Sequence, residues 1–491
     1  MTGLGALLSS TMATSAITVD GTRLTCEQVA AVARDGAQVN VAVEGIQRAH
    51  AAARVVRQVA TRRPVYGRTT GVGANRTTEV ESGDAHGLHL LRSHASGTGP
   101  LLARPYGRAM LVVRLNQLAA GGSGVDAAML DVLAGALNRG LAPPVHAYGS
   151  IGTADVVALA STALCILGEQ PWQGGSMAPF AMDPGDALAF MSSNAATVGT
   201  AALFCRDLRE RLDAGLVTAA LSCLAVDASR EHFAAVVHQA CPHPGQQGVA
   251  AGLRALLADD AGLPRRVQDP FSYRALPQVH GPAVDAAEHL DRLLAIEMNG
   301  AAENPLVDVS SNDVYHNGNF HNAYVAVGLD AARIALFQTA ALSTARLATL
   351  FEPQITGLRP FLADGPAADS GAMILEYVAH SALADLRQRA APAAIGIAVL
   401  SRGVEEHASF STQAARSGGE ALTAYDAVLS CELVAAVRAL NLRGVVPTGT
   451  RLRRAHTQLS TQLDPRTEDR PLSDDLAIAA RALPGLASLV H

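Results

Sequence analysis

The sequence predicts an all-α protein, and three observations carry that prediction. Alanine and leucine, both strong helix formers, dominate the 491 residues, whereas aromatic residues make up only 4%. Long segments repeat apolar residues at the spacing of a helix. Short polar or glycine-rich stretches separate these segments, and we expect function there, because loops on a rigid scaffold usually carry it.

The expected helices and domains follow from this periodicity. Three long segments have apolar residues at helical spacing: residues 27–62, 285–303 and 328–353. The apolar run "VVALASTALCILG", which starts at Val156, is expected to be a buried helix. The helices after about residue 200 are long enough to pack side by side. We therefore expect a loop-rich N-terminal domain over residues 1–200 and a long-helix bundle with a C-terminal helical region over residues 201–491.

Composition and charge narrow the class of partner. The net charge is −6 with no basic block, which argues against nucleic-acid binding and favours a small-molecule partner. No apolar run reaches the roughly 18 to 20 residues that span a bilayer, so we expect no membrane partner. All 38 basic residues are arginine, so a lysine Schiff base, including an anchored pyridoxal phosphate, is excluded.

The six cysteines and the N-terminus favour a cytoplasmic protein. The cysteines show no Cys-x-x-Cys spacing and mostly lie in apolar runs, as reduced core residues do. The first residues, "MTGLGALLSSTMATSAI", lack the basic flank of a secretory signal and are expected to form a frayed, unprocessed tail.

Three polar loops contain residue types suited to acid–base chemistry and carboxylate binding. Tyr66 precedes a glycine-rich turn, where a phenol acts as a general base if neighbours lower its pKa; the alternative is a tyrosine that only packs beside the loop. Arg274 ends "QDPFSYR", and its guanidinium suits either bidentate binding of a carboxylate or a surface salt bridge. Glu405 and Glu406 precede His407, a pattern that is also typical of a solvated helix start.

Nine segments in a fixed order carry a resemblance to one protein family. "VYGRTTGVG" is similar to the Tyr-Gly-x-Asn-Thr-Gly-Phe-Gly loop of the histidine and aromatic amino-acid ammonia-lyases and aminomutases. The further matches are "LLRSHASGTG", "LVVRLNQLAAGGSG", "YGSIGTAD", "QDPFSYRALPQVHG", "ENPLVDVSSNDVYHNGNFHN", "DSGAMI", "GVEEHASFS" and "EDRPLS". The resemblance implies an all-α ammonia-lyase-like fold, a homotetramer with active sites shared between subunits, and a small-molecule amino acid or carboxylate substrate.

The resemblance also assigns roles to single residues. It makes Tyr66 the catalytic base, and it makes Arg274, assisted by Asn304, the binding site of the substrate α-carboxylate. It places Glu405 beside the substrate amine. Four more residues would surround the substrate: His94 at the side-chain pocket, where a purely structural histidine is the alternative; Asn319 and Phe320 against the electrophile; and Gln268 in the loop around the amine.

The loop that forms the family's electrophile differs in this chain. The family needs no external cofactor, because Ala-Ser-Gly cyclises and loses water to form methylidene-imidazolone. Here "GSIGTAD" is one residue shorter, and an alignment anchored on its aspartate places Gly152, Thr153 and Ala154 under that tripeptide; an alignment anchored on Gly149 puts the gap inside it. Ring closure favours a third residue without a Cβ, and a dehydrated threonine would carry an extra methyl on the electrophilic carbon. The sequence predicts either an atypical imidazolone or an uncyclised loop.

Two further departures fall close to the same loop. Phe271 replaces the tyrosine of the family's "QDPYS", so a hydroxyl is lost, and Tyr273 is expected to point elsewhere. Ser192 of "FMSSNAA" aligns with the asparagine that helps to hold the electrophile, with Asn194 as the alternative.

Three functions remain open on this basis. The first is an ammonia-lyase or aminomutase of an aromatic or histidine-like amino acid, with an atypical or absent imidazolone; the retained Tyr66, Arg274, Asn304 and Glu405 favour it. The second is a repurposed member without the electrophile, such as an isomerase, a cyclase or an elimination catalyst, acting on an amino-acid-derived or carboxylate substrate. The third is an inactive ligand-binding homologue.

Overall fold

The residues that the structure describes form mainly α-helices, with three small two-stranded sheets. The computed structural model describes residues 16–80, 85–260 and 262–490, so most of the expected N-terminal tail lies outside the described residues. The chain forms two compact units: the first contains Met1–Leu203, Leu294–Ala323 and Gly396–Thr412, and the second contains Phe204–Leu293, Tyr324–Ile395 and Gln413–His491. This division differs from a single cut at residue 200, because two later loop segments join the first unit.

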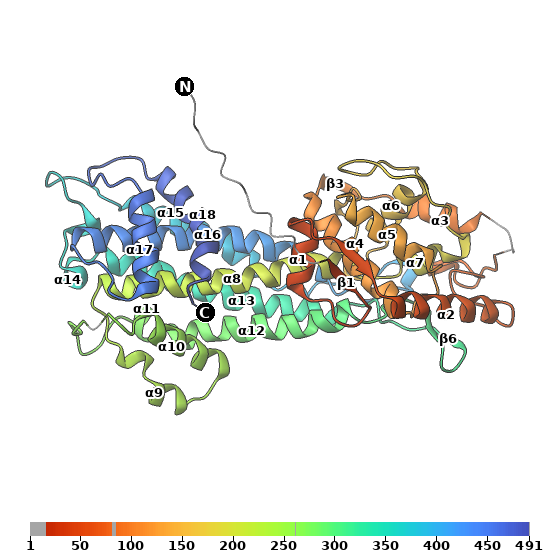
Figure 1. The fold of residues 1–491 in the computed structure, drawn as a ribbon, viewed down its shortest axis with the longest axis horizontal. Coiled ribbons are helices and arrows are strands. Elements are labelled where there is room, and N and C mark those ends of the chain that lie inside the picture. The colour runs from red at the N-terminus through yellow and green to blue at the C-terminus, as the bar shows by residue number, and fades with distance from the viewer. Residues whose placement is uncertain (1–15, 81–84, 261, 491) are drawn as a thin grey trace, which may run out of the picture. The chain divides into compact units, whose positions relative to one another are not determined.

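The first unit is built around a buried helix, α4. Its helices are α1 (Cys26–Arg34), α2 (Val43–Ala60), α3 (His86–His94), α4 (Arg104–Ala120), α5 (Ala128–Asn138), α6 (Val156–Leu167) and α7 (Ala187–Met191). Every residue of α4 from Gly107 to Ala119 is buried, as expected for a core helix, and α1, α2 and α5 pack against it (Figure 1). The predicted buried helix is α6, which packs against α3 and α7.

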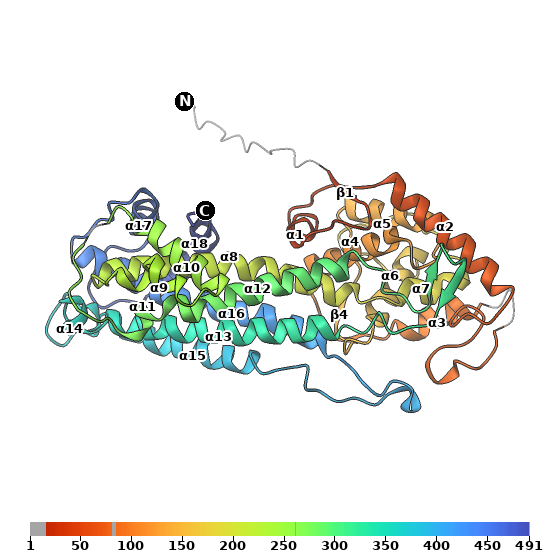
Figure 2. The same cartoon turned by 90° about the horizontal axis from the view of Figure 1, so that it is seen from below.

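The strands of the first unit connect its helices. They are β1 (Ile17–Val19), β2 (Val39–Val41), β3 (Thr98–Leu101), β4 (His146–Tyr148), β5 (Leu306–Asp308) and β6 (Asp313–Tyr315). The prediction of one helical segment over 27–62 is wrong, because Gly36 adopts a left-handed φ of +72° and β2 pairs in parallel with β1. The β5–β6 hairpin lies beside α2 (Figure 2).

The second unit is a bundle of long helices. Its helices are α8 (Ala195–Ala225, from Phe204 on), α9 (Ala235–Gln239), α10 (Pro244–Leu256), α11 (Phe271–Arg274), α12 (Leu276–Met298, up to Leu293), α13 (Ala323–Leu350, from Tyr324 on), α14 (Pro353–Thr356), α15 (Ile374–Arg389), α16 (Ser411–Leu442, from Gln413 on), α17 (Thr450–Gln462) and α18 (Ser473–Ala487). The helices α8, α12, α13 and α16 run side by side (Figures 1 and 2), so the predicted bundle is confirmed.

A buried ion pair ties three helices of the bundle together. Arg346 of α13 binds Glu432 of α16 through two contacts, Nε to Oε1 at 2.6 Å and Nη2 to Oε2 at 2.8 Å. The hydroxyls of Ser222 in α8 and Ser343 in α13 also donate to this carboxylate, at 2.7 and 2.5 Å. These four hydrogen bonds compensate the buried carboxylate for the loss of its hydration.

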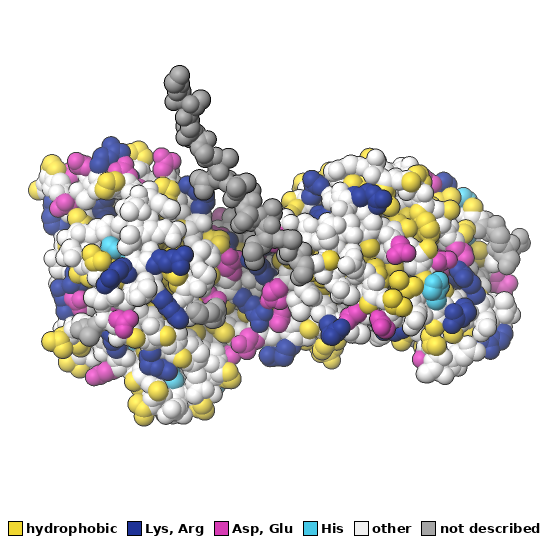
Figure 3. Space-filling model, in the orientation of Figure 1, with side chains coloured by type: hydrophobic (Ala, Val, Ile, Leu, Met, Phe, Trp, Pro, Cys, Tyr) yellow, Lys and Arg dark blue, Asp and Glu magenta, His cyan; other side chains and the backbone are white. Residues whose placement is uncertain are grey.

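Two helical stretches have the length and composition of a membrane span, which the sequence analysis did not anticipate. They are Pro184–Ala225 and Ala323–Leu350, and 89% and 56% of their most apolar windows are buried inside the protein. Core helices of a folded protein meet the same two criteria, so this resemblance to a span is weak evidence for a membrane partner. On the face drawn in Figure 3, arginine and acidic side chains are interspersed and form no block of one sign.

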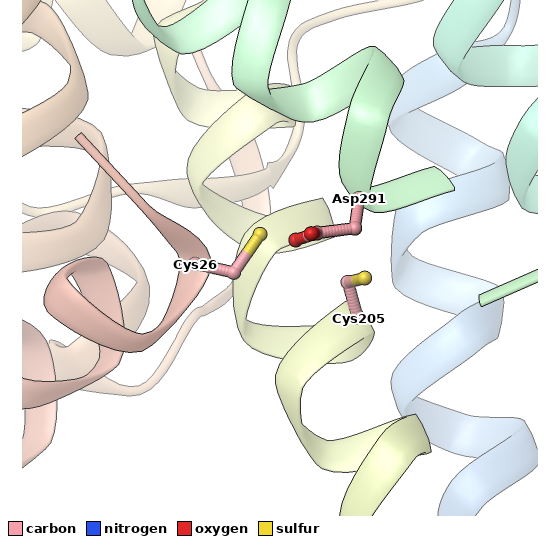
Figure 4. Close-up of side chains that lie close together, drawn as sticks. All are labelled: Cys26, Cys205 and Asp291. Atoms are coloured by element: carbon pink, nitrogen blue, oxygen red, sulfur yellow. The ribbon is translucent and has the colours of Figure 1, made fainter. Parts of the chain in front are cut away.

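The cysteines are free thiols among the described residues, and five of the six are buried, whereas Cys241 is exposed. Cys205 of α8 lies beside Asp291 of α12 within the second unit (Figure 4). Its thiol donates to the carbonyl oxygen of Ala287 at 3.6 Å. Burial raises the pKa of the Cys165, Cys223 and Cys431 thiols to about 12, as expected for inert core cysteines.

Candidate active site

The loop of Gly152, Thr153 and Ala154 joins β4 to α6 in the first unit. Both Gly152 and Ala154 have a left-handed backbone, with φ of +81° and +76°. Glycine adopts this conformation freely, but for alanine it costs roughly 1–2 kcal/mol. Ala154 is also 7% exposed, so the surrounding structure holds it in this strained conformation.

Two serine hydroxyls close the space around Gly152. Its carbonyl oxygen accepts hydrogen bonds from the Ser409 hydroxyl at 2.8 Å and from the Asn322 backbone N–H at 3.4 Å. A Cβ on residue 152 would lie 2.1 Å from Ser409 Oγ and 2.5 Å from Ser411 Oγ, far inside contact distance. Residue 152 therefore has to be glycine in this environment.

Asp155, which follows the loop, anchors it to the start of α8. Its carboxylate accepts hydrogen bonds from the Thr197 N–H at 2.7 Å, the Thr197 hydroxyl at 2.9 Å and the Ser150 hydroxyl at 2.7 Å. Its own N–H donates to the Ser193 carbonyl at 2.7 Å. Burial raises the pKa of Asp155, and these hydrogen bonds from Thr197 and Ser150 act in the opposite direction.

Tyr66 is half-buried and its ring lies near the short helix η1 (Gly73–Asn75). The Gly73 N–H donates to the Tyr66 hydroxyl at 2.7 Å. Burial raises the pKa of Tyr66, and the charge of Glu405 raises it further, whereas the bond from Gly73 and the charge of Arg76 lower it. The sequence made the role of base conditional on a lowered pKa; in this structure burial outweighs the two groups that lower the pKa, and Tyr66 rests as the neutral phenol.

A tight turn brings Glu405 to the Tyr66 loop. Leu400 and Glu405 pair through their backbones, with N–O distances of 2.7 and 3.3 Å. Between them, the Ser401 hydroxyl accepts a hydrogen bond from the Ala74 N–H at 2.9 Å. The turn is thereby fastened to η1, and the exposed Glu405 faces the same cavity as Tyr66.

Two adjoining cavities contain most of the predicted site residues. The first, of about 570 Å³, is lined among others by Tyr66, Thr153, Ala154, Ser192, Asn304, Phe320 and Glu405. The second, of about 610 Å³, shares Tyr66, Thr153, Ala154 and Glu405 with the first and adds three histidines of α3, which are His86, His89 and His94. The first-unit residues predicted from the sequence line one or both cavities, except Gly152 and Asn319.

Ser192 and Asn304 are placed by a buried arginine. Arg114 of α4 donates to Glu303 Oε1 at 2.6 Å and to the carbonyls of Ala189 and Phe190 at 2.6 and 3.1 Å. It thereby joins the end of α7 to the segment before Asn304. The Asn304 N–H then donates to the Ser192 hydroxyl at 3.0 Å.

Asn194 does not take the place of Ser192. Its carbonyl accepts from Gln117 at 2.9 Å and its amide donates to Glu297 at 2.7 Å, so both ends of the side chain are engaged away from the cavity. Ser192 is among the residues that line the cavity, and Asn194 is not.

His94 and Asn319 have local partners. His94 Nδ1 lies 2.9 Å from the carbonyl oxygen of Leu90, which accepts its hydrogen and leaves Nε2 as the second ring nitrogen. The Asn319 N–H donates to the Asn317 side chain at 2.8 Å, and Asn319 itself is exposed. Its predicted contact with the electrophile stays a prediction.

Sequence reasoning did not single out three further histidines near the loop. His316 accepts a hydrogen bond from the Tyr66 N–H at 3.2 Å, and partial burial lowers its pKa. His321 pairs its backbone with Thr153, and its Nε2 lies 2.9 Å from Nδ1 of His407. The clustering of His316 and His321 in "VYHNGNFHN" was the available indication.

The other predicted residues belong to the second unit. Gln268 is exposed, and the ring of Phe271 is 68% exposed, with the guanidinium carbon of Arg274 4.1 Å from its centroid. Phe271 thus supports Arg274 by a cation–π contact, which needs no hydroxyl. Tyr273 is buried and its hydroxyl lies 2.8 Å from that of Thr349, so it points differently from the exposed Phe271.

Comparisons with known proteins agree with this geometry. A family model described as aromatic amino acid lyase matches residues 24–461. The histidine ammonia-lyase of Symbiobacterium thermophilum is 33% identical over 492 residues, which cover 96% of each chain. Among solved structures, tyrosine aminomutase from Streptomyces globisporus has a TM-score of 0.89 at 28% identity and covers 96% of this chain and 97% of its own.

A second solved structure leads to the same result. Histidine ammonia-lyase from Trypanosoma cruzi has a TM-score of 0.89 at 26% identity and covers 96% of this chain and 94% of its own. The similarity therefore extends over both units and over the loops that line the two cavities. The chain belongs to the aromatic amino acid lyase family and is a carbon–nitrogen lyase of the ammonia-lyase type.

Proposed function

We propose that the protein eliminates or shifts the α-amino group of an aromatic or histidine-like amino acid by acid–base chemistry, without an imidazolone. The observation that carries the proposal is the cavity that joins Tyr66, Asn304 and Glu405 to the Thr153 loop. A phenol, an amide and a carboxylate are thus available to one small ligand.

The residues around the loop do not suit the family's ring. Ala154 replaces the glycine whose nitrogen closes the ring, and it already has a strained φ of +76°. Thr153 would give an electrophilic carbon hindered by a methyl group. We therefore derive no step through the ring.

The chemistry requires a base and a good leaving group. Tyr66, as phenolate, takes the proton from the carbon next to the C–N bond; the C–H electrons form the double bond, and the C–N electrons leave with ammonia. Because Tyr66 rests protonated, a bound ammonium group has to favour its ionisation, as a nearby cation does. Glu405 in the same cavity suits that ammonium group.

We propose that Gln268, Phe271 and Arg274 act on the cavity of a neighbouring subunit in a homotetramer. Support comes from Arg274, whose Nε is buried without a hydrogen-bond partner among the described residues, so that a carboxylate would supply the bond that it lacks. Mixing a Tyr66→Phe variant with an Arg274→Met variant tests this by complementation. Restored ammonia release is the expected result; if no activity returns, Arg76, which lines the cavity, is the better candidate for the carboxylate.

Ammonia release and intact mass test the reaction itself. The purified protein should release ammonia from histidine-like or aromatic amino acids while its mass equals that of the unmodified chain. An N,N,N-trimethylated substrate, which cannot add to an electrophile, should still eliminate. A mass lower by two waters, one lost in ring closure and one in dehydration of Thr153, together with inactivity on the trimethylated substrate, would establish the ring mechanism instead. If the protein bound such amino acids but released no ammonia, it would instead be an inactive ligand-binding homologue.

A further inference from the structure

We infer that Thr153 keeps its hydroxyl and uses it to accept a hydrogen bond from the ammonium group of the substrate. Two features carry this inference. Thr153 lines the same cavities as Tyr66 and Glu405, and its hydroxyl has no hydrogen-bond partner among the described residues, although hydrogen bonds fix the loop on both sides of it. It rests on the proposed function and names a new role for residue 153, in which the residue is a binding group and not the precursor of an electrophile.

The Thr153 hydroxyl is available to a ligand. Thr153 lines both cavities, and its hydroxyl makes no hydrogen bond with any residue that the structure describes. Its neighbours differ in this respect, because the hydroxyls of Ser150, Ser409 and Thr197 all bond within the protein. A polar group left without a protein partner at the wall of a cavity is suited to bind a polar ligand atom.

The backbone of Thr153 is fixed on both sides. Its antiparallel bridge to His321 is backed by the 2.9 Å contact between the rings of His321 and His407. The Gly152 carbonyl before it and the Asp155 carboxylate after it are both hydrogen-bonded to buried groups. The hydroxyl is therefore presented from a rigid support, which lowers the conformational entropy lost when a ligand binds.

The chemistry of the cavity selects the ligand atom. A threonine oxygen has two lone pairs and accepts from an N–H donor. Glu405 supplies the negative charge that attracts an ammonium group into the cavity. Removal of one hydrogen bond to a charged group typically weakens binding about 10- to 100-fold. The same nitrogen is the leaving group, so its contact with Thr153 also orients the C–N bond.

A binding experiment without turnover tests the contact. Phenylglycine has an α-ammonium group but no hydrogen on its next carbon, so it binds without eliminating, and calorimetry measures its dissociation constant. Thr153→Val, which removes only the hydroxyl, should weaken binding about 10- to 100-fold, and Thr153→Ser should restore most of it. Thr78→Val, a change at an exposed threonine that does not line the first cavity, should bind as the unaltered protein does.

The N,N,N-trimethyl derivative of phenylglycine supplies the second comparison. It has the same charge but no N–H, so Thr153→Val and the unaltered protein should bind it equally. Equal affinity of both proteins for phenylglycine, equal weakening for both ligands, or no binding of phenylglycine by the unaltered protein would each refute the contact. Failure of the proposed function is a separate result, since it is measured as absent ammonia release and does not alter the dissociation constants.

Discussion

Tyr66 is the residue whose ionisation governs the proposed reaction, and its environment predicts a pH dependence. The base form is the phenolate, so kcat/KM should rise with pH, and the raised pKa of Tyr66 places this rise on the alkaline side. Glu405 is one of the causes, and Glu405→Gln removes its charge. The rise should therefore move to lower pH in this variant, even if the maximal rate falls.

The pH profile of kcat/KM measures this shift, and the chain offers a matched control. Glu406→Gln removes the same charge from the adjacent exposed residue, whose influence on Tyr66 is not among the causes of the shift. Its profile should coincide with that of the unaltered protein. Identical alkaline limbs for Glu405→Gln and the unaltered protein would mean that another group is the base.

Gly152 shows how narrowly the loop is constrained. Gly152→Ala combines a left-handed φ with a Cβ that would lie 2.1 Å from Ser409 Oγ, so we expect a loss of about 2–4 kcal/mol of unfolding free energy. Gly140→Ala has a similar φ of +72° but nothing within 4 Å, and should lose only about 1–2 kcal/mol. Chemical denaturation measures the unfolding free energy of both variants. Equal losses would show that Ser409 and Ser411 move aside to make room for the Cβ.

Sequence reasoning found most of the cavity but left its electrostatics open. Tyr66, Asn304 and Glu405 were found because motif order places them, and the structure brings all three to one cavity. The pKa of Tyr66 could not be predicted, because burial depends on packing that no short motif contains. His316 was missed because its contact with Tyr66 joins residues 250 positions apart.

At the scale of elements, the Arg114–Glu303 pair positions two walls of the cavity at once. Removing one partner of a buried pair leaves the other charge uncompensated, and typically costs about 3–5 kcal/mol. Arg114→Met should lose stability of this size, and in addition it should raise KM, because the end of α7 and the segment before Asn304 lose their common anchor. Denaturation and steady-state kinetics measure the two effects.

A second change in the same pair separates charge from packing. In the double variant Arg114→Met with Glu303→Leu, no unpaired carboxylate remains, so part of the stability should return. The KM should stay high, since the bonds from Arg114 to the Ala189 and Phe190 carbonyls are still missing. If the KM recovered together with stability, Arg114 would have no positioning role.

The elements themselves were predictable to different degrees. Long apolar periodicity identified the buried α6 and the long α13, where tertiary packing and local pattern agree. It failed over residues 27–62, because the valines of β2 continue the apolar pattern while Gly36 turns the chain. The return of residues 294–323 and 396–412 to the first unit is a long-range contact, which periodicity does not report.

At the scale of the whole molecule, the second unit depends on the buried Arg346–Glu432 pair. Arg346 is 2% and Glu432 0% exposed, and the carboxylate also receives two serine hydroxyls from α8 and α13. Arg346→Met leaves that carboxylate buried and unpaired, so the unit should lose about 3–5 kcal/mol. Arg389→Met breaks a pair of similar length whose side chains are each 48% exposed, and should cost about 0–1 kcal/mol.

Thermal unfolding of the two arginine variants tests whether burial decides the effect. Both substitutions remove one positive charge, so a long-range charge effect would lower the two melting temperatures equally. Burial predicts a large decrease for Arg346→Met and almost none for Arg389→Met, and the difference should persist in high salt, because salt screens only the exposed pair. A decrease for Arg346→Met that disappears in high salt would mean that water and ions reach Glu432. The packing of α8, α13 and α16 would then not exclude solvent from this pair.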